Sequence, residues 1–162
     1  MIEQASKQDG RTDFDFFMGT WKVHNRRLRE RLKGSTSWEE FEGKTVARKI
    51  LGGLGNFEEF TMERESGAGE GITLRIFNPE SGQWSVYLGN NVSGFDPQPA
   101  IGEFRDGRGE FYSQEFFAGK SIFCRVIWSA IAQGSWQWEQ AFSTDGGKTW
   151  ETNWISTFER LA

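Results

Sequence analysis

The amino-acid sequence predicts an all-β protein: a single closed antiparallel up-and-down barrel of about ten strands, with a short N-terminal helical plug. Aromatic residues make up 15% of the 162 residues, including 8 Trp and 15 Phe, and such side chains fit the half-buried surface of a sheet. The 20 Gly residues recur at short intervals, as tight hairpin turns require. No amphipathic helix of useful length is available for the crossovers of a parallel sheet. Closing such a meander removes both sheet edges and encloses a cavity.

The chain divides into a polar lead over residues 1–13, predicted to be flexible, and one β-barrel domain over residues 14–162. An aromatic cluster, Phe14 to Phe17, precedes Gly19 and predicts the helical plug. Alternating apolar residues and short turns then predict ten strands. These run over residues 21–32, 38–50, 57–64, 72–77, 83–88, 101–105, 110–116, 121–130, 136–142 and 150–158. The longest connection, residues 89–99, holds two of the three Pro residues and is a candidate lid.

Composition and charge exclude several classes of partner. The net charge is -4 and the isoelectric point about 5.2, which argues against a nucleic-acid binder and against a polybasic membrane anchor. The N-terminus lacks the apolar core of a signal peptide, so the predicted location is cytoplasmic. A core of this size needs neither disulfides nor a structural metal, in agreement with the single cysteine. Whether the barrel forms a homo-oligomer is left open.

A family resemblance begins at the first strand. Gly19-Thr20-Trp21, following the aromatic plug, resembles the Gly-x-Trp signature of lipocalins and related calycin barrels. In a closed meander the first strand lies beside the last, which brings Arg160 near Trp21. The resemblance implies that this arginine covers the indole and seals the barrel floor, a cation–π contact worth about 0.5–2 kcal/mol. The whole-chain pattern also resembles an uncharacterised bacterial family of lipocalin-like barrels, a domain of unknown function, which implies a cavity but no catalytic residues.

A second motif lies near the C-terminus. Residues 143–150, Ser-Thr-Asp-Gly-Gly-Lys-Thr-Trp, fit the Asp-box pattern Ser-x-Asp-x-Gly-x-x-Trp that is familiar from sialidases. In that motif the carboxylate satisfies backbone donors inside the hairpin loop while the indole packs beneath it. Asp145 and Trp150 are therefore predicted to be structural, since a single Asp-box is neither a glycosidase site nor a propeller.

The polar residues that could carry chemistry are few. His24 is the only histidine, which removes most hydrolase templates and any multi-histidine metal site, and its strand phase opposite to Trp21 predicts a surface position. Haem would need His24, Tyr87, Tyr112 or Cys124 as its axial ligand, so no haem, other cofactor or metal is predicted. Cys124 is predicted to be a small buried hydrophobe.

The basic run in the first strand has two interpretations. Folding the first hairpin about residues 33–37 would place Arg29 opposite Glu40 and Arg27 opposite Glu42, as a cross-strand ladder of opposite charges. Alternatively, one arginine turns inward and binds a carboxylate ligand. The sequence does not decide which of Arg26, Arg27 and Arg29 faces inward.

The aromatic residues expected inside the barrel lead to the functional prediction. The first hypothesis is a non-catalytic carrier or sensor for a mostly apolar, aromatic or acyl ligand in the barrel cavity. The predicted ligand-binding residues are Trp84, Tyr87, Trp128, Trp138, Gln140 and Trp154. One alternative is a cavity enzyme of cyclase, isomerase or hydratase type, with Glu139, Tyr112 or an arginine as acid or base. The second alternative is an interaction or scaffold barrel with a solid core.

Overall fold

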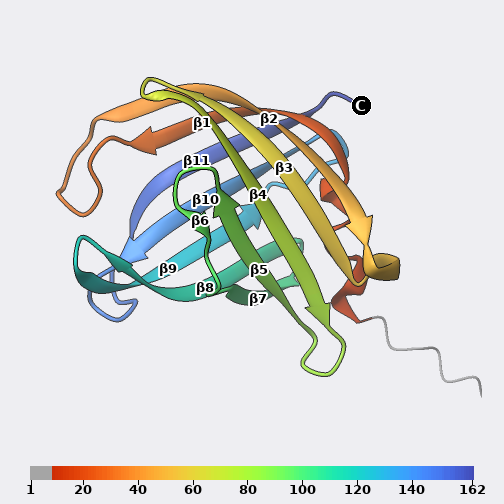
Figure 1. Cartoon of the computed structure of the whole chain (residues 1–162). Coiled ribbons are helices and arrows are strands. Elements are labelled where there is room, and N and C mark those ends of the chain that lie inside the picture. Colours follow the sequence, from red (N-terminus) through yellow and green to blue (C-terminus); the bar gives the residue numbers. More distant parts are fainter. Residues whose placement is uncertain (1–8) are drawn as a thin grey trace, which may run out of the picture.

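The computed structural model describes residues 9–162, and these residues form a closed antiparallel barrel of ten strands, as predicted (Figure 1). The barrel strands are β1 (Gly19–Leu28), β2 (Trp38–Ile50), β3 (Gly55–Arg64), β4 (Gly67–Asn78), β5 (Gln83–Asn90), β7 (Ala100–Arg105), β8 (Arg108–Phe117), β9 (Lys120–Ser129), β10 (Ser135–Ser143) and β11 (Glu151–Arg160). The short strand β6 (Gly94–Phe95) pairs with β5. Pairing of β1 with β11 and of β4 with β5 closes the ring. No helix among the described residues is long and apolar enough to cross a membrane.

Two predicted strand boundaries differ from the structure by more than two residues. The first strand ends at Leu28 instead of at residue 32, and residues 67–71, predicted to be a flexible connection, instead begin β4. The glycines in this stretch make room for side chains of the neighbouring strand. A Cβ at Gly71, for example, would lie 2.1 Å from the ring of Phe60 on β3. A Gly-rich sequence can therefore form a strand here, because side chains of the neighbouring strand β3 fill the space that the glycines leave.

The predicted N-terminal plug is present as η1 (Gly10–Thr12) and η2 (Asp15–Phe17), two 3-10 turns at one end of the barrel. Phe14 and Phe17 are fully buried. The Phe14 ring meets the rings of Trp84 and Trp128 edge to face, with centroids 4.9 and 5.1 Å away. These aromatic contacts fill the plugged end of the barrel and leave no room for a ligand there.

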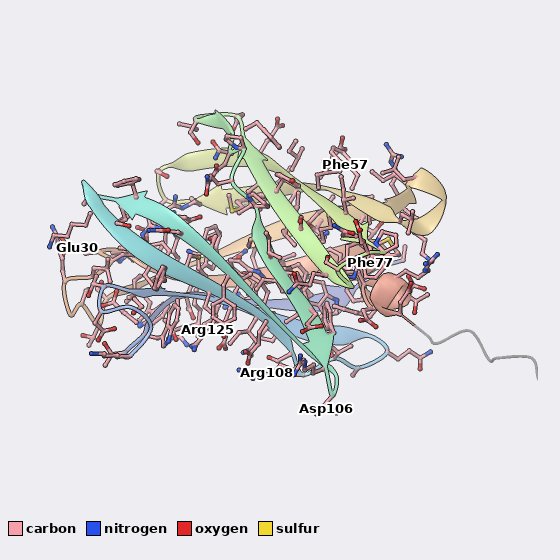
Figure 2. The ribbon with its side chains drawn as sticks, turned by 90° about the horizontal axis from the view of Figure 1, so that it is seen from below. Glu30, Phe57, Phe77, Asp106, Arg108 and Arg125 are labelled. Atoms are coloured by element: carbon pink, nitrogen blue, oxygen red, sulfur yellow. The ribbon has the colours of Figure 1, made fainter. Side chains whose placement is uncertain are left out.

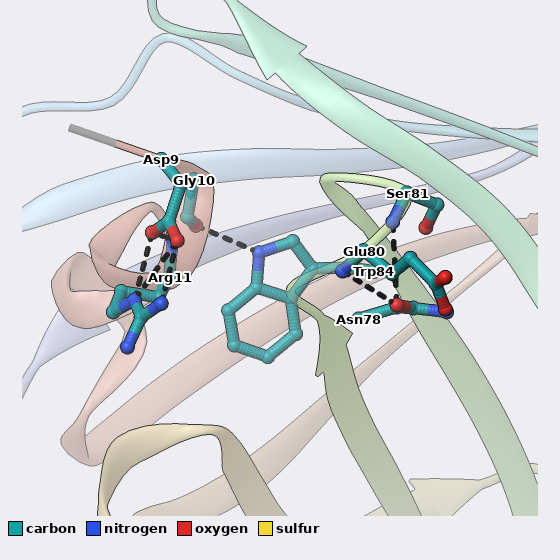
Figure 3. Close-up of polar contacts among 7 residues, drawn as sticks. All are labelled: Asp9, Gly10, Arg11, Asn78, Glu80, Ser81 and Trp84. Atoms are coloured by element: carbon teal, nitrogen blue, oxygen red, sulfur yellow. Dashed lines mark hydrogen bonds and ion pairs between the residues drawn. The ribbon is translucent and has the colours of Figure 1, made fainter. Parts of the chain in front are cut away.

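The lead into the plug is fixed to the barrel by hydrogen bonds (Figure 3). The indole Nε1 of Trp84 donates to the carbonyl of Gly10 at 2.9 Å, and Asp9 accepts from the backbone N–H of Arg11 at the start of η1. Asn78 holds the neighbouring β4–β5 turn by accepting from the backbone N–H of Glu80. Of the lead predicted to be flexible, residues 1–8 lie outside the described residues, and Asp9, Gly10 and Arg11 make the contacts given above.

Trp21, Arg160 and Gly19 join the first and last strands at the plugged end. Trp21 is completely buried, and its Nε1 donates to the carbonyl of Phe17 at 2.7 Å. The guanidinium of Arg160 lies 4.3 Å from the centroid of the indole. Gly19 has a φ of +116°, and a Cβ there would lie 2.7 Å from Nη1 of Arg160. Glycine is therefore required where the arginine crosses the chain.

Candidate ligand-binding cavity

A cavity of about 550 Å³ occupies the barrel between the plug and the opposite, open end. Phe17, Arg75 and Trp128 form its floor, and the hairpin residues Gly67 and Val92 belong to its open end. The interior is thus packed solid at one end and hollow at the other, unlike the filled interior that a solid-core scaffold requires. A volume of this size falls within the range of roughly 300–1,000 Å³ that is typical of small-molecule sites.

Four of the six predicted ligand-binding residues line this cavity: Trp128, Trp138, Gln140 and Trp154. The other two, Trp84 and Tyr87, lie outside the lining. Trp84 points inward, but so close to the plug that Phe14 and Phe77 cover it. Tyr87 alternates with Val86, which points into the barrel, and stacks outside on Phe95 with ring centroids 5.9 Å apart.

The indoles of the wall are held by buried polar groups. Trp154 donates from Nε1 to Oδ1 of Asn25 at 3.0 Å, and Ser156 donates to the same oxygen at 2.6 Å. Trp138 and Trp154 meet edge to face, with ring centroids 5.6 Å apart. Asn25 was not predicted from the sequence as a site residue, although it shares the inward phase of Trp21 on β1. Its hydrogen bonds fix one wall of the cavity.

The amide of Gln140 also has a buried partner. Its Nε2 donates to Oδ1 of Asn153 at 2.9 Å, and Asn153 is fully buried. The pairing of β10 with β11 shifts its register between Gln140 and Ala141, which is a β-bulge. The bulge turns Asn153 toward Gln140, and a period-two pattern does not reveal it.

A buried ion pair lies at the cavity floor. Arg75 donates to the carboxylate of Glu58 and to Oδ1 of Asn56, the latter at 2.9 Å. Thr45 donates to the other oxygen of Glu58 at 2.6 Å. The Arg75 guanidinium stacks 4.2 Å from the centroid of Phe17, and burial lowers its pKa while Glu58 opposes that shift. This network spans three strands and was not predicted from the sequence.

The charge ladder predicted for the first hairpin has different members. The predicted pairs Arg29–Glu40 and Arg27–Glu42 are wrong, because the two strands pair with Arg26 opposite Glu40 and Arg27 opposite Glu39. The long connection between Leu28 and Trp38 sets this register. On the outer face Arg26 contacts Glu40 at 3.5 Å, and Arg29 instead binds Glu65.

His24 lies on the surface, as its strand phase predicts, with 44% of its side chain exposed. Its Nδ1 lies 2.6 Å from a carboxylate oxygen of Glu42. This hydrogen bond raises the pKa of the imidazole. Because the ring points away from the barrel interior, His24 belongs to the outer charge ladder and not to the cavity.

Of the acids and bases proposed for a cavity enzyme, Glu139 and Tyr112 do not line the cavity, whereas arginines do. Glu139 alternates with the inward residues of β10 and accepts a hydrogen bond from Gln137 at 3.1 Å. Tyr112 is half exposed and donates to Glu110 at 3.0 Å. Cys124 is buried in the cavity wall, and burial raises the pKa of its thiol, which disfavours a reactive thiolate.

The Asp-box hairpin is outside the cavity. Oδ1 of Asp145 accepts from the backbone N–H of Thr149 at 2.9 Å, and Oδ2 accepts from the Thr149 hydroxyl at 2.6 Å. These bonds lower the pKa of Asp145 to about 2. Trp150 packs on the outer face of β9, where the guanidinium of Arg125 lies 4.5 Å from its ring centroid; Figure 2 labels Arg125 on this strand.

No protein-family model and no curated protein matches the chain. Solved structures do match its fold. The S-type phycobiliprotein lyase CPES from Guillardia theta is 12% identical with a TM-score of 0.62, over 96% of this chain and 94% of that chain. EF1p2_mFAP2b bound to DFHBI is 8% identical with a TM-score of 0.51, over 94% of this chain and 99% of that chain. These matches are consistent with the calycin-type barrel fold that the sequence predicts, while the resemblance to a bacterial family of unknown function gains no support.

Proposed function

We propose that this barrel is a carrier or sensor that binds a mostly apolar small molecule, aromatic or acyl in character. The observation that carries the proposal is the cavity of about 550 Å³ in a barrel whose other end is closely packed. Protein interiors ordinarily leave few voids larger than a water molecule, so a hollow of this size indicates an occupant. A protein of similar fold, EF1p2_mFAP2b, has been solved bound to DFHBI, which supports a small-molecule ligand for a barrel of this kind.

The ligand would lie against the indoles of Trp138 and Trp154, with Trp128 beneath it. Both wall indoles are already oriented by their contacts, so little conformational freedom would be lost on binding. Gln140 is the polar group nearest to them in strand register, and its carbonyl oxygen is free to accept from a ligand donor while Nε2 donates to Asn153. Trp84 and Tyr87 would support the barrel without contacting the ligand.

A cavity enzyme is the second candidate, and one residue favours it. Glu115 lines the cavity, and burial raises the pKa of its carboxyl, as in general acids. Glu58 suits that role less well, because both of its oxygens already accept hydrogen bonds. Incubating the protein with a bound compound and analysing the released compound by chromatography coupled to mass spectrometry separates the candidates, since a carrier returns it with unchanged retention time and mass.

Native mass spectrometry of the protein purified from its own host tests the proposal. We expect a fraction of the protein to carry a small organic molecule that denaturation releases. The matched variant is Val126→Phe, which adds bulk to the cavity wall and should emerge without the adduct. An adduct of equal abundance in both proteins would place the molecule outside the cavity and contradict the proposal.

A further inference from the structure

Three arginines gather at the open end of the cavity, and we refer to Arg27, Arg31 and Arg64 as the arginine cluster. Arg27 points inward from β1 and lines the cavity together with Arg64 of β3. Arg31, in the β1–β2 connection, lies over the ring of Phe117 at 4.6 Å and lines an adjoining hollow. The two hollows share Asp96, Gln98 and Glu115, so the cluster surrounds one continuous opening.

Arg27 is the member that lines the cavity without an ion-pair partner; Arg31 forms no ion pair among the described residues either, but it lines only the adjoining hollow. Arg27 forms no ion pair with any residue in the described range 9–162, and its buried Nε has no hydrogen-bond acceptor there. Its cross-strand neighbour Glu39 is already engaged, by Arg64 at 2.9 Å and by the backbone N–H of Glu65 at 2.9 Å. On the same strand, Arg26 has its own carboxylate in Glu40. A half-buried guanidinium without a counter-charge is unfavourable unless something else supplies one.

The guanidinium of Arg27 is also held in place. It stacks over the indole of Trp154, 4.7 Å from the ring centroid, and that indole is itself fixed by Asn25. Stacking occupies the face of the guanidinium and burial covers Nε, so Nη1 and Nη2 carry the N–H donors that a ligand can reach. A planar fork of this kind matches the two oxygens of a carboxylate or sulfonate.

The surrounding charges favour an anion. Burial, together with repulsion by Arg31 and Arg64, lowers the pKa of Arg27 to about 10. The carboxylates around the opening are Glu39, which is bound to Arg64, half-buried Glu115, and exposed Asp96, which lines both hollows. Burial raises the pKa of Glu115, which favours its neutral form. Among the described residues, none of these three carboxylates forms an ion pair with Arg27, and only Glu39 is paired with a member of the cluster.

We infer that the ligand of this cavity is an amphipathic anion, whose carboxylate or sulfonate binds the edge of Arg27 while its apolar body lies against Trp138 and Trp154. The inference rests on the proposed function and adds the chemical class of the ligand. It also fixes the orientation, with the acid at the open end and the apolar body toward the plug.

Two fluorescent probes test this inference: 1-anilinonaphthalene-8-sulfonate and N-phenyl-1-naphthylamine, which share a skeleton and differ by the sulfonate. We expect the wild-type protein to bind the sulfonate more tightly. Arg27→Gln should weaken sulfonate binding by about tenfold or more, because hydrogen bonds to charged groups are worth at least about one decade in affinity. Binding of the neutral probe should change by less than about threefold. Arg27→Lys, which keeps the charge and loses the planar fork, should be intermediate.

Arg26→Gln is the matched control, since Arg26 is the next residue on β1 and points outward toward Glu40. Neither probe should respond to it. Equal wild-type affinity for the two probes, or equal losses for both probes in Arg27→Lys, would overturn the inference and leave the proposed function intact. If the wild type bound neither of the two probes, the result would contradict the proposed function and, with it, the inference.

Discussion

At the scale of single residues, Trp21 shows how one side chain connects distant parts of the chain. Its ring lies under Arg160 of the last strand, and its Nε1 binds the plug at Phe17. The motif Gly19-Thr20-Trp21 predicted this position because closure of the meander brings the first and last strands together. Arg27 lies six residues after Trp21 and shares its inward phase, but Arg29 has the same phase in the sequence, and only the end of β1 at Leu28 decides between them.

Replacing Trp21 by alanine should lower the free energy of unfolding by about 3–5 kcal/mol, as large aromatic truncations in a core do. The loss includes the indole volume, the hydrogen bond to Phe17 and the contact with Arg160. Urea denaturation measures the change, and Trp21→Phe, which keeps most of the volume, should lose less. A loss below about 1 kcal/mol would contradict a structural role for this residue.

Asp145 gives a prediction that depends on pH. Its pKa is about 2 in the folded protein, below the ordinary value of 3.8 that it regains on unfolding, so the ionised form stabilises the fold. This stabilisation is present above about pH 4 and is lost as the pH falls through about 2. Asp145→Asn should therefore melt below the wild type near neutral pH, with the difference shrinking as the pH falls below about 4. Thermal melts of both proteins across the acid range measure the difference.

Ligand binding should be unaffected by Asp145→Asn, because the Asp-box hairpin lies outside the cavity. A difference in melting temperature that is constant over the whole acid range would show that the carboxylate charge does not hold the hairpin. Loss of probe binding in Asp145→Asn at an unchanged melting temperature would assign the hairpin to the site.

At the scale of elements, β4 shows where reasoning from a single strand fails. Its apolar alternation at Ile72, Leu74 and Ile76 resembles a core-facing pattern, yet Thr73, Arg75 and Phe77 are the buried residues. Arg75 can be buried because its partner Glu58 lies on the neighbouring strand. Register and pairing between strands decide the inward face, and neither can be read from one segment.

The Arg75–Glu58 pair should behave as one unit in a double-mutant cycle. Arg75→Met leaves the buried Glu58 carboxylate without its counter-charge and should destabilise the protein by about 3–5 kcal/mol. Adding Glu58→Gln removes that charge, so the double variant should be more stable than the sum of the single losses implies. Additive losses in urea denaturation would show that the two residues are not coupled.

At the scale of the whole molecule, the two ends of the barrel differ: one is closely packed and the other is hollow. Aromatic side chains and the plug fill one end, and the other end holds the cavity and the arginine cluster. Strand number, closure and plug followed from turn spacing and aromatic content. The depth of each inward side chain along the barrel could not be predicted in this way, because it depends on the stagger between strands. For this reason Trp84, which lies at the plugged end, was wrongly assigned to the cavity.

The wall indoles should dominate affinity for apolar probes. Trp138→Ala and Trp154→Ala should each weaken the binding of N-phenyl-1-naphthylamine, since aromatic contacts contribute about 0.5–1.5 kcal/mol per ring pair beyond the area they bury. Fluorescence titration measures the change. His24→Ala should bind like the wild type, because His24 faces outward to Glu42. Equal loss in all three variants would indicate a general effect on folding instead of a wall of the site.

Titration of the wild-type protein and of Val126→Phe with N-phenyl-1-naphthylamine tests the cavity most directly, with melting temperatures measured at each concentration. The wild type should show a single saturable site and a melting temperature that rises with probe concentration, because the probe binds the folded state. Val126→Phe should stay folded and lose most of both responses. An unsaturable wild-type signal, or an undiminished response in Val126→Phe, would contradict the claim that this barrel holds its ligand inside.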